Sequence, residues 1–541
     1  MTSFHDVANA RPRDGERSCA ARERDLALYL ARRFLPLEDG TIALADWSAE
    51  NLAWLRPVFC DAEFVCLTRS DLNAEIVRRY GARLTQEAIH ALDRRTPLLS
   101  ARRVVTMRQA AVLSLTAAML LALAYVRPSA LLVGLIALMS ALFLLSVFFR
   151  ALLALWGAPP REASRAVADK DLPAYTILVP LYREAAVLPA LTRALLSLDY
   201  PCGLLDIKLI VEADDLETAR ACAAFDGPFE VVSVPPSLPR TKPKAVNFAL
   251  PFARGEFVVI YDAEDRPEPD QLRKAVAMFR ALPQTTACLQ ARLAFYNAPE
   301  NWLTRQFEAD YRLWFGMLLQ GLDRLGVPIP LGGTSNHFRI DVLRDIGAWD
   351  PFNVTEDADL GIRLSQRGFR VAMLDSTTFE EAPTRLGVWI KQRSRWLKGY
   401  MQTWLVHSRQ TGSLVRQTGL KGFLAFQFFI GGAVVSALVN PLLWIVCVLS
   451  YVFPGLFPSG LEQLSAAGAI GSNSILAGLA VRAAIRCGDR RLLPCGLTVA
   501  FYWLLISVAA WRGLWHLVTR PFHWEKTTHG LSRHAAGSSD A

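Results

Sequence analysis

The chain has 541 residues, of which 52% are hydrophobic and 20% charged, and its formal net charge is +9. This composition excludes a purely soluble protein and a bundle of membrane helices alone, and it indicates soluble domains joined to membrane spans. The positive charge suits a protein that lies on an anionic lipid bilayer or binds an anionic substrate. Nucleic acid is not expected as a partner, because no basic recognition helix or aromatic-basic sheet motif is evident. The nine cysteines form no C-x-x-C pair, which argues against a zinc site or a disulfide framework.

The N-terminal part of the chain divides into two segments by composition. Residues 1–24 are polar and carry charges of both signs, as is typical of a tail without a core of its own. Residues 25–95 mix amphipathic helix patterns with short apolar runs, and we expect a small α+β domain there. This unit is either a regulatory domain or a folded cap on the first membrane span, and its sequence leaves both interpretations open.

A transmembrane hairpin is predicted at residues 110–150. Residues 110–126 and 129–149 contain no charged side chain, and each is close to the ~20 residues that a helix needs to cross a bilayer. Arginines precede the pair (Arg102, Arg103) and follow it (Arg150). By the positive-inside rule, both ends of the hairpin are expected in the cytoplasm.

Residues 172–405 are predicted to form a soluble α/β domain. Short β-branched runs that end in polar turns alternate there with helix-like segments, which favours a mostly parallel sheet covered by helices on both faces. In such sheets, ligands bind beyond the carboxyl ends of the strands. The expected strands are YTILVP (175–180), DIKLIVEAD (206–214), FEVVSVP (229–235) and GEFVVIYDAED (255–265), and the expected helices include EAAVLPALTRALLSL (184–198) and DQLRKAVAMFRAL (270–282).

Further membrane spans are predicted at residues 420–515. The stretch from Phe423 to Leu461 lacks Asp, Glu, Lys and Arg, and its length suggests two spans with a bend near Asn440–Pro441. Gln463–Val481 and Leu492–Trp511 are two more candidates. The number of spans is therefore three or four. We favour four, because four spans return the C-terminal tail, residues 519–541, to the cytoplasm.

An acidic turn follows the strand at 255–261. Asp262 and Glu264 are two residues apart, so they point the same way on an extended backbone, and Asp265 follows at once. Two carboxylates aimed together suit Mg²⁺ or Mn²⁺, which take their remaining ligands from phosphates and water. The alternative is a solvated acidic surface turn without a function.

Four other segments carry residues of matching chemistry, although a solvated charged face is the alternative for each. Lys242 and Lys244 are suited to a diphosphate, and a base N–H can donate to Asp214 or Asp215. A general base at Asp357 would stand at the start of a helix. The segments are TKPKAVNFAL (241–250), VEADD (211–215), VTEDADLGIRL (354–364) and KQRSRWLKGY (391–400).

In order, these motifs resemble those of the processive, membrane-embedded family 2 glycosyltransferases, such as the synthases of cellulose and hyaluronan. That family shows an early Asp, a D-x-D, a T-E-D and a Q-x-x-R-W, with spans on either side. The counterparts here are Asp214–Asp215, DAE at 262–264, TED at 355–357 and QRSRW at 392–396. The chain departs from the pattern at Glu264, where the family has Asp, so either Glu264 or Asp265 is left as the second metal ligand.

The resemblance implies a role for each matching residue. Asp214 and Asp215 would contact the nucleotide base, Lys244 and Arg395 would bind the rest of the donor nucleotide, and Asp262 with Glu264 would hold the metal. Asp357 would be the catalytic base. The implied acceptor-binding residues are Gln392, Trp396 and Glu356, together with Gly333, Thr334 and Ser335 of the segment GGTSNHF (332–338).

Two more segments carry weaker resemblances. The tail segment TRPFHWEKTTHGLS (519–532) is similar to a W-E-K-T-x-H-G stretch of related bacterial transferases, which implies a loop over the nucleotide site formed by Trp524, Lys526, Thr527 and His529. An aromatic-basic membrane anchor is the alternative. Residues 25–95 resemble the N-terminal domain of type II secretion ATPases, some of which bind cyclic di-GMP, so regulation by that nucleotide is a hypothesis.

The resemblance predicts a multi-pass enzyme of the bacterial inner membrane with its catalytic domain in the cytoplasm. A UDP- or GDP-sugar would be polymerised, with inversion at the anomeric carbon, into a β-linked polysaccharide that the protein would also export. Transfer of a single sugar to a lipid carrier is the alternative reaction. A transporter or receptor with a degenerate enzyme domain is a third interpretation, and filled motif positions argue against it.

Overall fold

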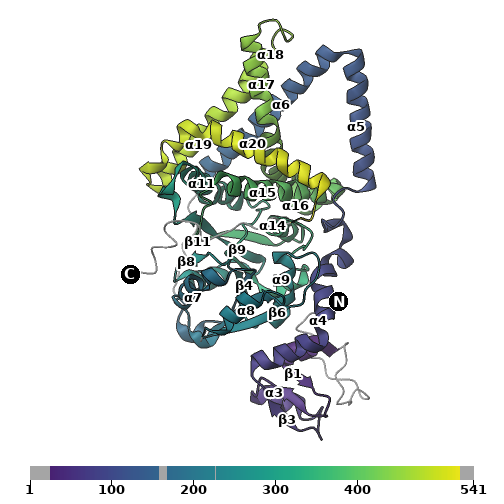
Figure 1. Ribbon diagram of the computed structural model, residues 1–541, viewed down its shortest axis with the longest axis vertical. Coiled ribbons are helices and arrows are strands. Elements are labelled where there is room, and N and C mark those ends of the chain that lie inside the picture. The colour runs from purple at the N-terminus through teal and green to yellow at the C-terminus, as the bar shows by residue number, and fades with distance from the viewer. Residues whose placement is uncertain (1–24, 158–166, 226, 524–541) are drawn as a thin grey trace.

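The computed structural model describes residues 25–157, 167–225 and 227–523. It has three parts stacked along its long axis: a small N-terminal domain, a central α/β domain and a group of long helices (Figure 1). The helix α4 (Arg69–Arg95) leaves the N-terminal domain and packs along the central one, where it contacts β6 and α9.

The N-terminal domain is a three-stranded sheet with helices. Its strands β1 (Phe34–Pro36) and β2 (Ile42–Leu44) pair antiparallel, and β2 pairs parallel with β3 (Phe64–Cys66). The helices α2 (Leu26–Arg32), α3 (Ala49–Leu55) and α4 complete the domain. The side chain of Ser48 caps α3, as the short polar residue at an N-cap predicts.

The central domain is built on an eight-stranded mixed sheet in the order β6-β5-β4-β7-β10-β9-β11-β8. Strands β6 to β7 and the pair β9–β11 run parallel, whereas β10 runs antiparallel to both of its neighbours. The expected α/β fold with a mostly parallel sheet is thus confirmed. The strands are β4 (Tyr175–Leu181), β5 (Leu205–Glu212), β6 (Phe229–Val234), β7 (Phe257–Ile260), β8 (Arg266–Pro267), β9 (Thr286–Phe295), β10 (Asn336–Arg339) and β11 (Arg370–Glu380).

Helices cover both faces of this sheet. Along β4, Ile177 and Val179 pack into one core with helix α7, while Leu178 between them packs into the other core with α9. A strand that is apolar on both sides requires such double cover. The helices of this domain are α7 (Leu188–Leu196), α8 (Leu216–Ala223), α9 (Lys242–Ala249), α10 (Gln271–Ala281), α11 (Trp302–Leu313), α12 (Leu319–Leu325), α13 (Ile340–Asp345) and α14 (Glu356–Gln366).

Strand directions bring the motif segments to one edge of the sheet. The carboxyl ends of β4, β5, β7, β9 and β11 meet there. Because β10 is antiparallel to β7 and its Asn336 pairs with Ile260, the residues just before β10 stand beside the acidic turn just after β7. This edge faces the long helices.

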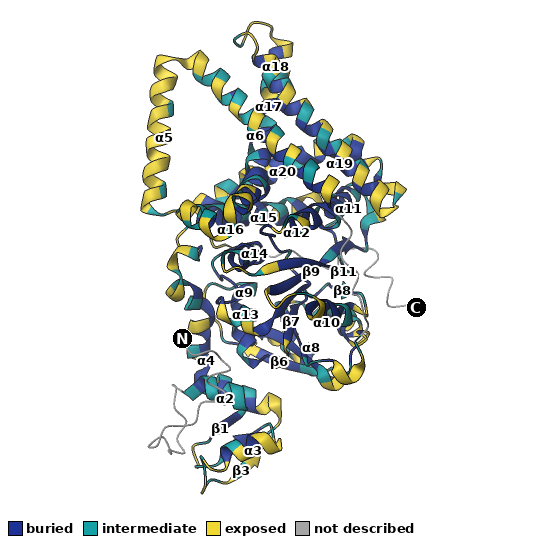
Figure 2. Ribbon diagram, turned by 180° about the vertical axis from the view of Figure 1, so that it is seen from behind, coloured by how far each residue is buried: buried dark blue, intermediate teal, exposed yellow. Residues whose placement is uncertain are grey.

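Among the residues that the structure describes, five helical segments are long and apolar enough to cross a membrane: Met107–Val126, Pro128–Trp156, Leu386–Val452, Leu461–Cys487 and Cys495–Thr519. They comprise α5 (Met107–Val126), α6 (Pro128–Trp156), α15 (Leu386–His407), α16 (Thr411–Phe426), α17 (Gly432–Val452), α18 (Leu461–Ala466), α19 (Ser472–Cys487) and α20 (Cys495–Thr519). No residue of α5 is buried (Figure 2).

The expectation of two spans between Phe423 and Leu461 is wrong. Helix α17 passes through Pro441 without a break, and the side chain of Asn440 accepts a hydrogen bond from Asn473 of α19 at 3.0 Å. Packing against neighbouring helices lets a membrane helix tolerate proline. The apolar run ends in a turn that contains Gly455 and Gly460, both at positive φ, rather than in a second span. Up to residue 523, where the described part of the chain ends, three apolar helical segments, not four, therefore follow the α/β domain.

Helix α20 lies along the α/β domain. At its start, Gln306 of α11 donates to the carbonyl of Cys495 at 3.0 Å. Just after its end, Lys398 of α15 donates to the carbonyls of Arg520 at 3.4 Å and His523 at 2.7 Å. Between these points α20 packs on α15 (Figure 1).

Candidate active site

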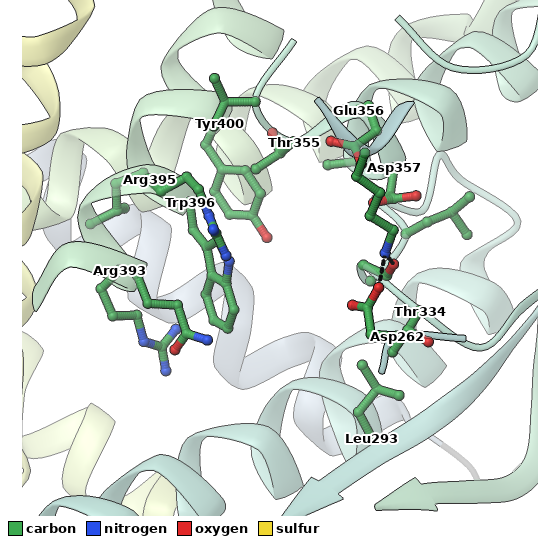
Figure 3. Close-up of a pocket in the computed structure, with 18 of the residues that line it drawn as sticks. Asp262, Leu293, Thr334, Thr355, Glu356, Asp357, Arg393, Arg395, Trp396 and Tyr400 are labelled. Carbon is green, nitrogen blue, oxygen red and sulfur yellow. Dashed lines mark hydrogen bonds and ion pairs between the residues drawn. The ribbon is translucent and has the colours of Figure 1, made fainter. Parts of the chain in front are cut away.

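A cavity of about 910 Å³ opens where the carboxyl edge of the sheet meets the long helices. One wall, here called the acidic wall, consists of Asp262, Glu264, Glu356 and Asp357. The opposite wall, the aromatic wall, consists of Arg393, Arg395, Trp396 and Tyr400 of α15 (Figure 3). The cavity continues between the long helices, where most of the residues that line it are apolar, among them Ala433, Leu476, Ala480, Val499 and Ile506.

The structure distinguishes the two neighbours in the acidic turn. Asp262 and Glu264 line the cavity, whereas Asp265 is buried and only 1% exposed. The carboxylate of Asp265 accepts a hydrogen bond from the backbone N–H of Asp262 at 2.8 Å and another from the hydroxyl of Thr334. Asp265 therefore holds the turn in shape, and Glu264 is the candidate for the second metal ligand.

Asp357 and Glu356 stand at the first turn of α14, where the helix N-terminus favours negative charge. The indole N–H of Trp349 donates to Asp357 at 3.1 Å and fixes its orientation. Burial, followed by repulsion from Glu356, raises the pKa of Asp357 well above its ordinary value. Burial also raises the pKa of Glu356 to about 7. A carboxylate with a raised pKa is a stronger proton acceptor, which is what a general base requires.

The lysine at the acidic wall is Lys242, not the predicted Lys244. Lys242 donates to Asp262 and to the carbonyl of Gly333 and lines the cavity. Lys244 is fully buried and pairs with Glu212 at 2.7 Å. The reason is helical geometry, since side chains two residues apart on α9 point to nearly opposite sides.

The two lysines are expected to respond differently to substitution. Lys244→Met leaves the buried Glu212 carboxylate without its partner and should lower the free energy of unfolding by about 3–5 kcal/mol. Lys242→Met should leave unfolding nearly unchanged and weaken donor binding. Thermal unfolding and nucleotide-sugar binding, measured on both variants, check this. A Lys244→Met protein of normal stability with weakened donor binding would restore the original assignment.

The predicted base-binding residues lie beside the cavity rather than in its lining. Asp215 is 7% exposed and accepts hydrogen bonds from the backbone N–H groups of Thr218, at the start of α8, and Arg183. Asp214 pairs with Arg240 at 2.8 Å, and Arg240 also contacts the Tyr182 ring. Arg240 and Tyr182 do line the cavity. The guanidinium of Arg240 and the ring of Tyr182 are suited to bind a nucleotide base. No sequence motif indicated these two residues.

The predicted acceptor residues on α15 lie on the cavity. Gln392 is 8% exposed, and its Oε1 atom is buried without a hydrogen-bond partner among the described residues. Trp396 packs against Tyr311, with ring centroids 6.2 Å apart. An aromatic ring and an open amide acceptor are groups that bind a sugar face and a hydroxyl.

The segment before β10 divides between the cavity and the interior. Gly333 and Thr334 line the cavity, and a Cβ on Gly333 would lie 3.9 Å from Asp357 Oδ2. Ser335 is instead fully buried, and its hydroxyl donates to Thr378 at 2.7 Å. Ser335 is therefore not an acceptor contact in this structure.

Trp524, Lys526, Thr527 and His529, predicted to cover the nucleotide site, lie outside the described residues. The two residues before them, Phe522 and His523, line the cavity. The chain therefore reaches the site just before the predicted loop begins.

The acidic wall suits a divalent metal. Asp262 and Glu264 offer hard oxygen donors at the cavity. Burial, and after it repulsion from Asp265, Glu264 and Asp262, raises the pKa of Glu380, at the end of β11, well above its ordinary value. Within the described ranges, no three His, Cys, Asp or Glu side chains form a complete metal site. Phosphate oxygens and water would have to supply further ligands.

Residues 173–399 match the family described as glycosyltransferase like family 2. A β-monoglucosyldiacylglycerol synthase of Synechocystis is 27% identical over 398 residues, which are 69% of this chain and 78% of that protein. A glucomannan 4-β-mannosyltransferase of Arabidopsis thaliana is 32% identical over 145 residues, 27% of each chain. The mannosyltransferase PcManGT from Pyrobaculum calidifontis, solved with GDP-Man and Mn²⁺, is 17% identical with a TM-score of 0.46 and covers 70% of this chain and 99% of its own.

The chain spans 53% to 62% of the length of other curated relatives that it matches, so their whole activities are not transferred to it. The family match covers the sheet, the acidic wall, the aromatic wall except Tyr400, and most of α15. The central region of this chain, residues 173–399, is a family 2 glycosyltransferase domain.

Proposed function

We propose that the protein transfers a sugar from a nucleotide-sugar donor, a UDP- or GDP-sugar, to a hydroxyl of an amphipathic lipid at the cytoplasmic face of a bacterial inner membrane. The observation that carries this proposal is the continuous cavity, which joins carboxylates and basic groups to an apolar compartment between long helices. An apolar compartment favours a hydrocarbon chain, because a sugar polymer would leave its hydroxyls there without partners. The Synechocystis relative, named as a synthase of a glucosyl lipid, supports the same choice.

The proposed reaction is a single displacement. Asp357 accepts the proton of the acceptor hydroxyl, whose oxygen forms a bond to the anomeric carbon from the face opposite the donor diphosphate. The bond between that carbon and the diphosphate oxygen breaks, and the nucleoside diphosphate leaves with the electron pair. One displacement inverts the anomeric configuration, so an α-linked donor gives a β-linked product.

The remaining residues of the cavity would position the substrates. Arg240 and Tyr182 would hold the base, and Lys242 and Arg395 would stabilise the negative charge that develops on the diphosphate. Asp262 and Glu264 would hold Mg²⁺ or Mn²⁺, which when bound supplies Lewis-acid stabilisation of the leaving diphosphate. Trp396 and Gln392 would contact the acceptor.

Polymerisation of the sugar is the second candidate. It is favoured by the QRSRW motif on α15 and by the match to a protein named as a glucomannan 4-β-mannosyltransferase. In that case the aromatic wall would bind the growing polysaccharide, and export through the bilayer would follow. Regulation by cyclic di-GMP through the N-terminal domain stays a prediction; α4, which packs on β6 and α9, is the element that would transmit it.

Product size distinguishes the candidates. Purified protein in lipid vesicles would be incubated with labelled UDP- and GDP-sugars, Mg²⁺ or Mn²⁺, and diacylglycerol or phosphatidylglycerol. Label in one lipid-soluble product with a single sugar supports the proposal. Label in high-molecular-weight polymer replaces it with polymerisation, and no transfer from any donor contradicts both.

A further inference from the structure

An arginine of a membrane helix lies buried at the deep end of the cavity. Arg150, near the end of α6, is 5% exposed and lines the cavity where the long helices enclose it. Its Nε atom is buried and has no hydrogen-bond partner among the described residues. Across the part of the chain that the structure describes, Arg150 forms no hydrogen bond or ion pair, and its one direct contact of note is the Trp503 ring, 5.2 Å away.

The nearest carboxylate is already neutralised. Asp310 acts on Arg150 electrostatically, but it forms an ion pair with Arg393 at 2.6 Å. Arg393 also donates to the hydroxyl of Tyr502 at 2.8 Å. Of the two arginines at this end of the cavity, Arg393 is paired and Arg150 has no ion-pair partner among the described residues, so the deep end has a surplus positive charge.

A buried cation without a partner is costly in a low-dielectric environment, and in membrane segments such groups usually mark a ligand or ion site. An anion at Arg150 would offset that cost, and a phosphate offers acceptor oxygens that match the guanidinium. The apolar residues Leu476, Ala480 and Ile506 line the same end of the cavity. The site thus combines one cation with room for a hydrocarbon chain.

We propose that Arg150 binds the phosphate of an anionic acceptor lipid, with the lipid chain between the long helices and a headgroup hydroxyl directed toward Asp357. This inference rests on the proposed function and makes it more specific, because it selects a phospholipid with a hydroxyl-bearing headgroup over neutral diacylglycerol. The phosphate at Arg150 is distinct from the donor diphosphate, whose basic partners are Lys242 at the acidic wall and Arg395 on the aromatic wall; both act electrostatically on Glu356.

The test measures binding without turnover. The full-length protein in detergent would be titrated with dioctanoyl phosphatidylglycerol, dioctanoylglycerol, glycerol phosphate and UDP or GDP. We expect wild type to prefer the phospholipid over dioctanoylglycerol by about tenfold or more, as a charge-assisted hydrogen bond implies. Arg150→Gln should lose this preference, and Arg150→Lys should retain part of it. Arg127→Gln, at the exposed start of the same helix, is the matched control and should change nothing.

Four outcomes would overturn the inference. Two concern the lipids: wild type shows no preference for the phospholipid, or Arg150→Gln keeps the wild-type preference. The other two are that glycerol phosphate binds as tightly as the phospholipid and depends on Arg150, or that Arg150→Gln loses as much affinity for UDP or GDP as for the phospholipid. The third would indicate a soluble phosphate and the fourth the donor. If Arg150→Gln does not fold, the preference for the phospholipid is compared between Arg150→Lys and wild type. A smaller preference in Arg150→Lys supports the inference, and an equal preference contradicts it. Arg150-dependent lipid binding without sugar transfer would contradict the proposed function and leave this site standing.

Discussion

Asp357→Asn is expected to lower kcat by about 10²–10⁴-fold, the range that general-base catalysis supplies, while donor binding stays close to wild type. Asparagine keeps an acceptor oxygen for the indole N–H of Trp349, so the side chain should hold its place but lose its basicity. Sugar transfer and nucleotide binding, measured on one preparation, would show both effects. An Asp357→Asn protein with normal function would favour the receptor or transporter interpretation.

The pH dependence of kcat/KM offers a control on this assignment. A general base acts when deprotonated, and burial raises the pKa of Asp357 well above its ordinary value and that of Glu356 to about 7. Activity should therefore rise with pH through an acid limb far above the pH of about 4 at which an exposed carboxyl titrates. Glu356→Gln removes a neighbouring negative charge and should move the limb to lower pH. A limb near pH 4 in wild type would contradict the assignment.

Asp262→Asn is the second change with a large expected effect. It removes a carboxylate of the predicted metal site, and we expect transfer to fall by about 10²-fold or more, because metal stabilisation of a leaving diphosphate is worth several kcal/mol. Activity of the Asp262→Asn protein would be titrated with Mn²⁺ and Mg²⁺. We expect either that a higher metal concentration is needed for half-maximal activity or that no metal concentration restores the wild-type rate.

Asp265→Asn is the matched comparison, since Asp265 is an adjacent carboxylate that faces the interior. Burial raises its pKa well above the ordinary value, so a neutral amide is a fair substitute there. We expect a modest change in thermal stability and an unchanged metal requirement. Equal metal requirements in the Asp262→Asn and Asp265→Asn proteins would contradict the assignment of Asp262, but not Asp265, to the metal site.

Local sequence patterns predicted much of the α/β fold. Continuous apolar runs such as the one ending at Tyr261 correctly indicated strands, and the acidic residues after them indicated the carboxyl edge of the sheet. The pattern did not distinguish Lys242 from Lys244, because that choice depends on where helix α9 begins. Nor did the pattern show that Thr334 faces the cavity while Ser335 faces the interior, because this depends on the positive φ of Ser335.

Contacts between residues that are far apart in the chain could not be predicted from the sequence. Arg150 was counted as a charge that flanks a membrane span, but packing against Trp503 places it inside the cavity. Arg240 and Tyr182 are 58 positions apart and carry no motif, so their stacking emerges only from the fold.

Helix α20 has a consequence for membrane topology. Hydropathy counts it as a span, yet both of its ends are tied by hydrogen bonds to α11 and α15 on the same side of the protein. A helix anchored in this way would lie in the plane of the interface and contribute no crossing. Over the described residues the chain would then cross the bilayer four times, so residues 25 and 523 would lie in the same compartment. Reporter fusions at the two ends of α20 should give the same signal, whereas a true crossing would give opposite ones.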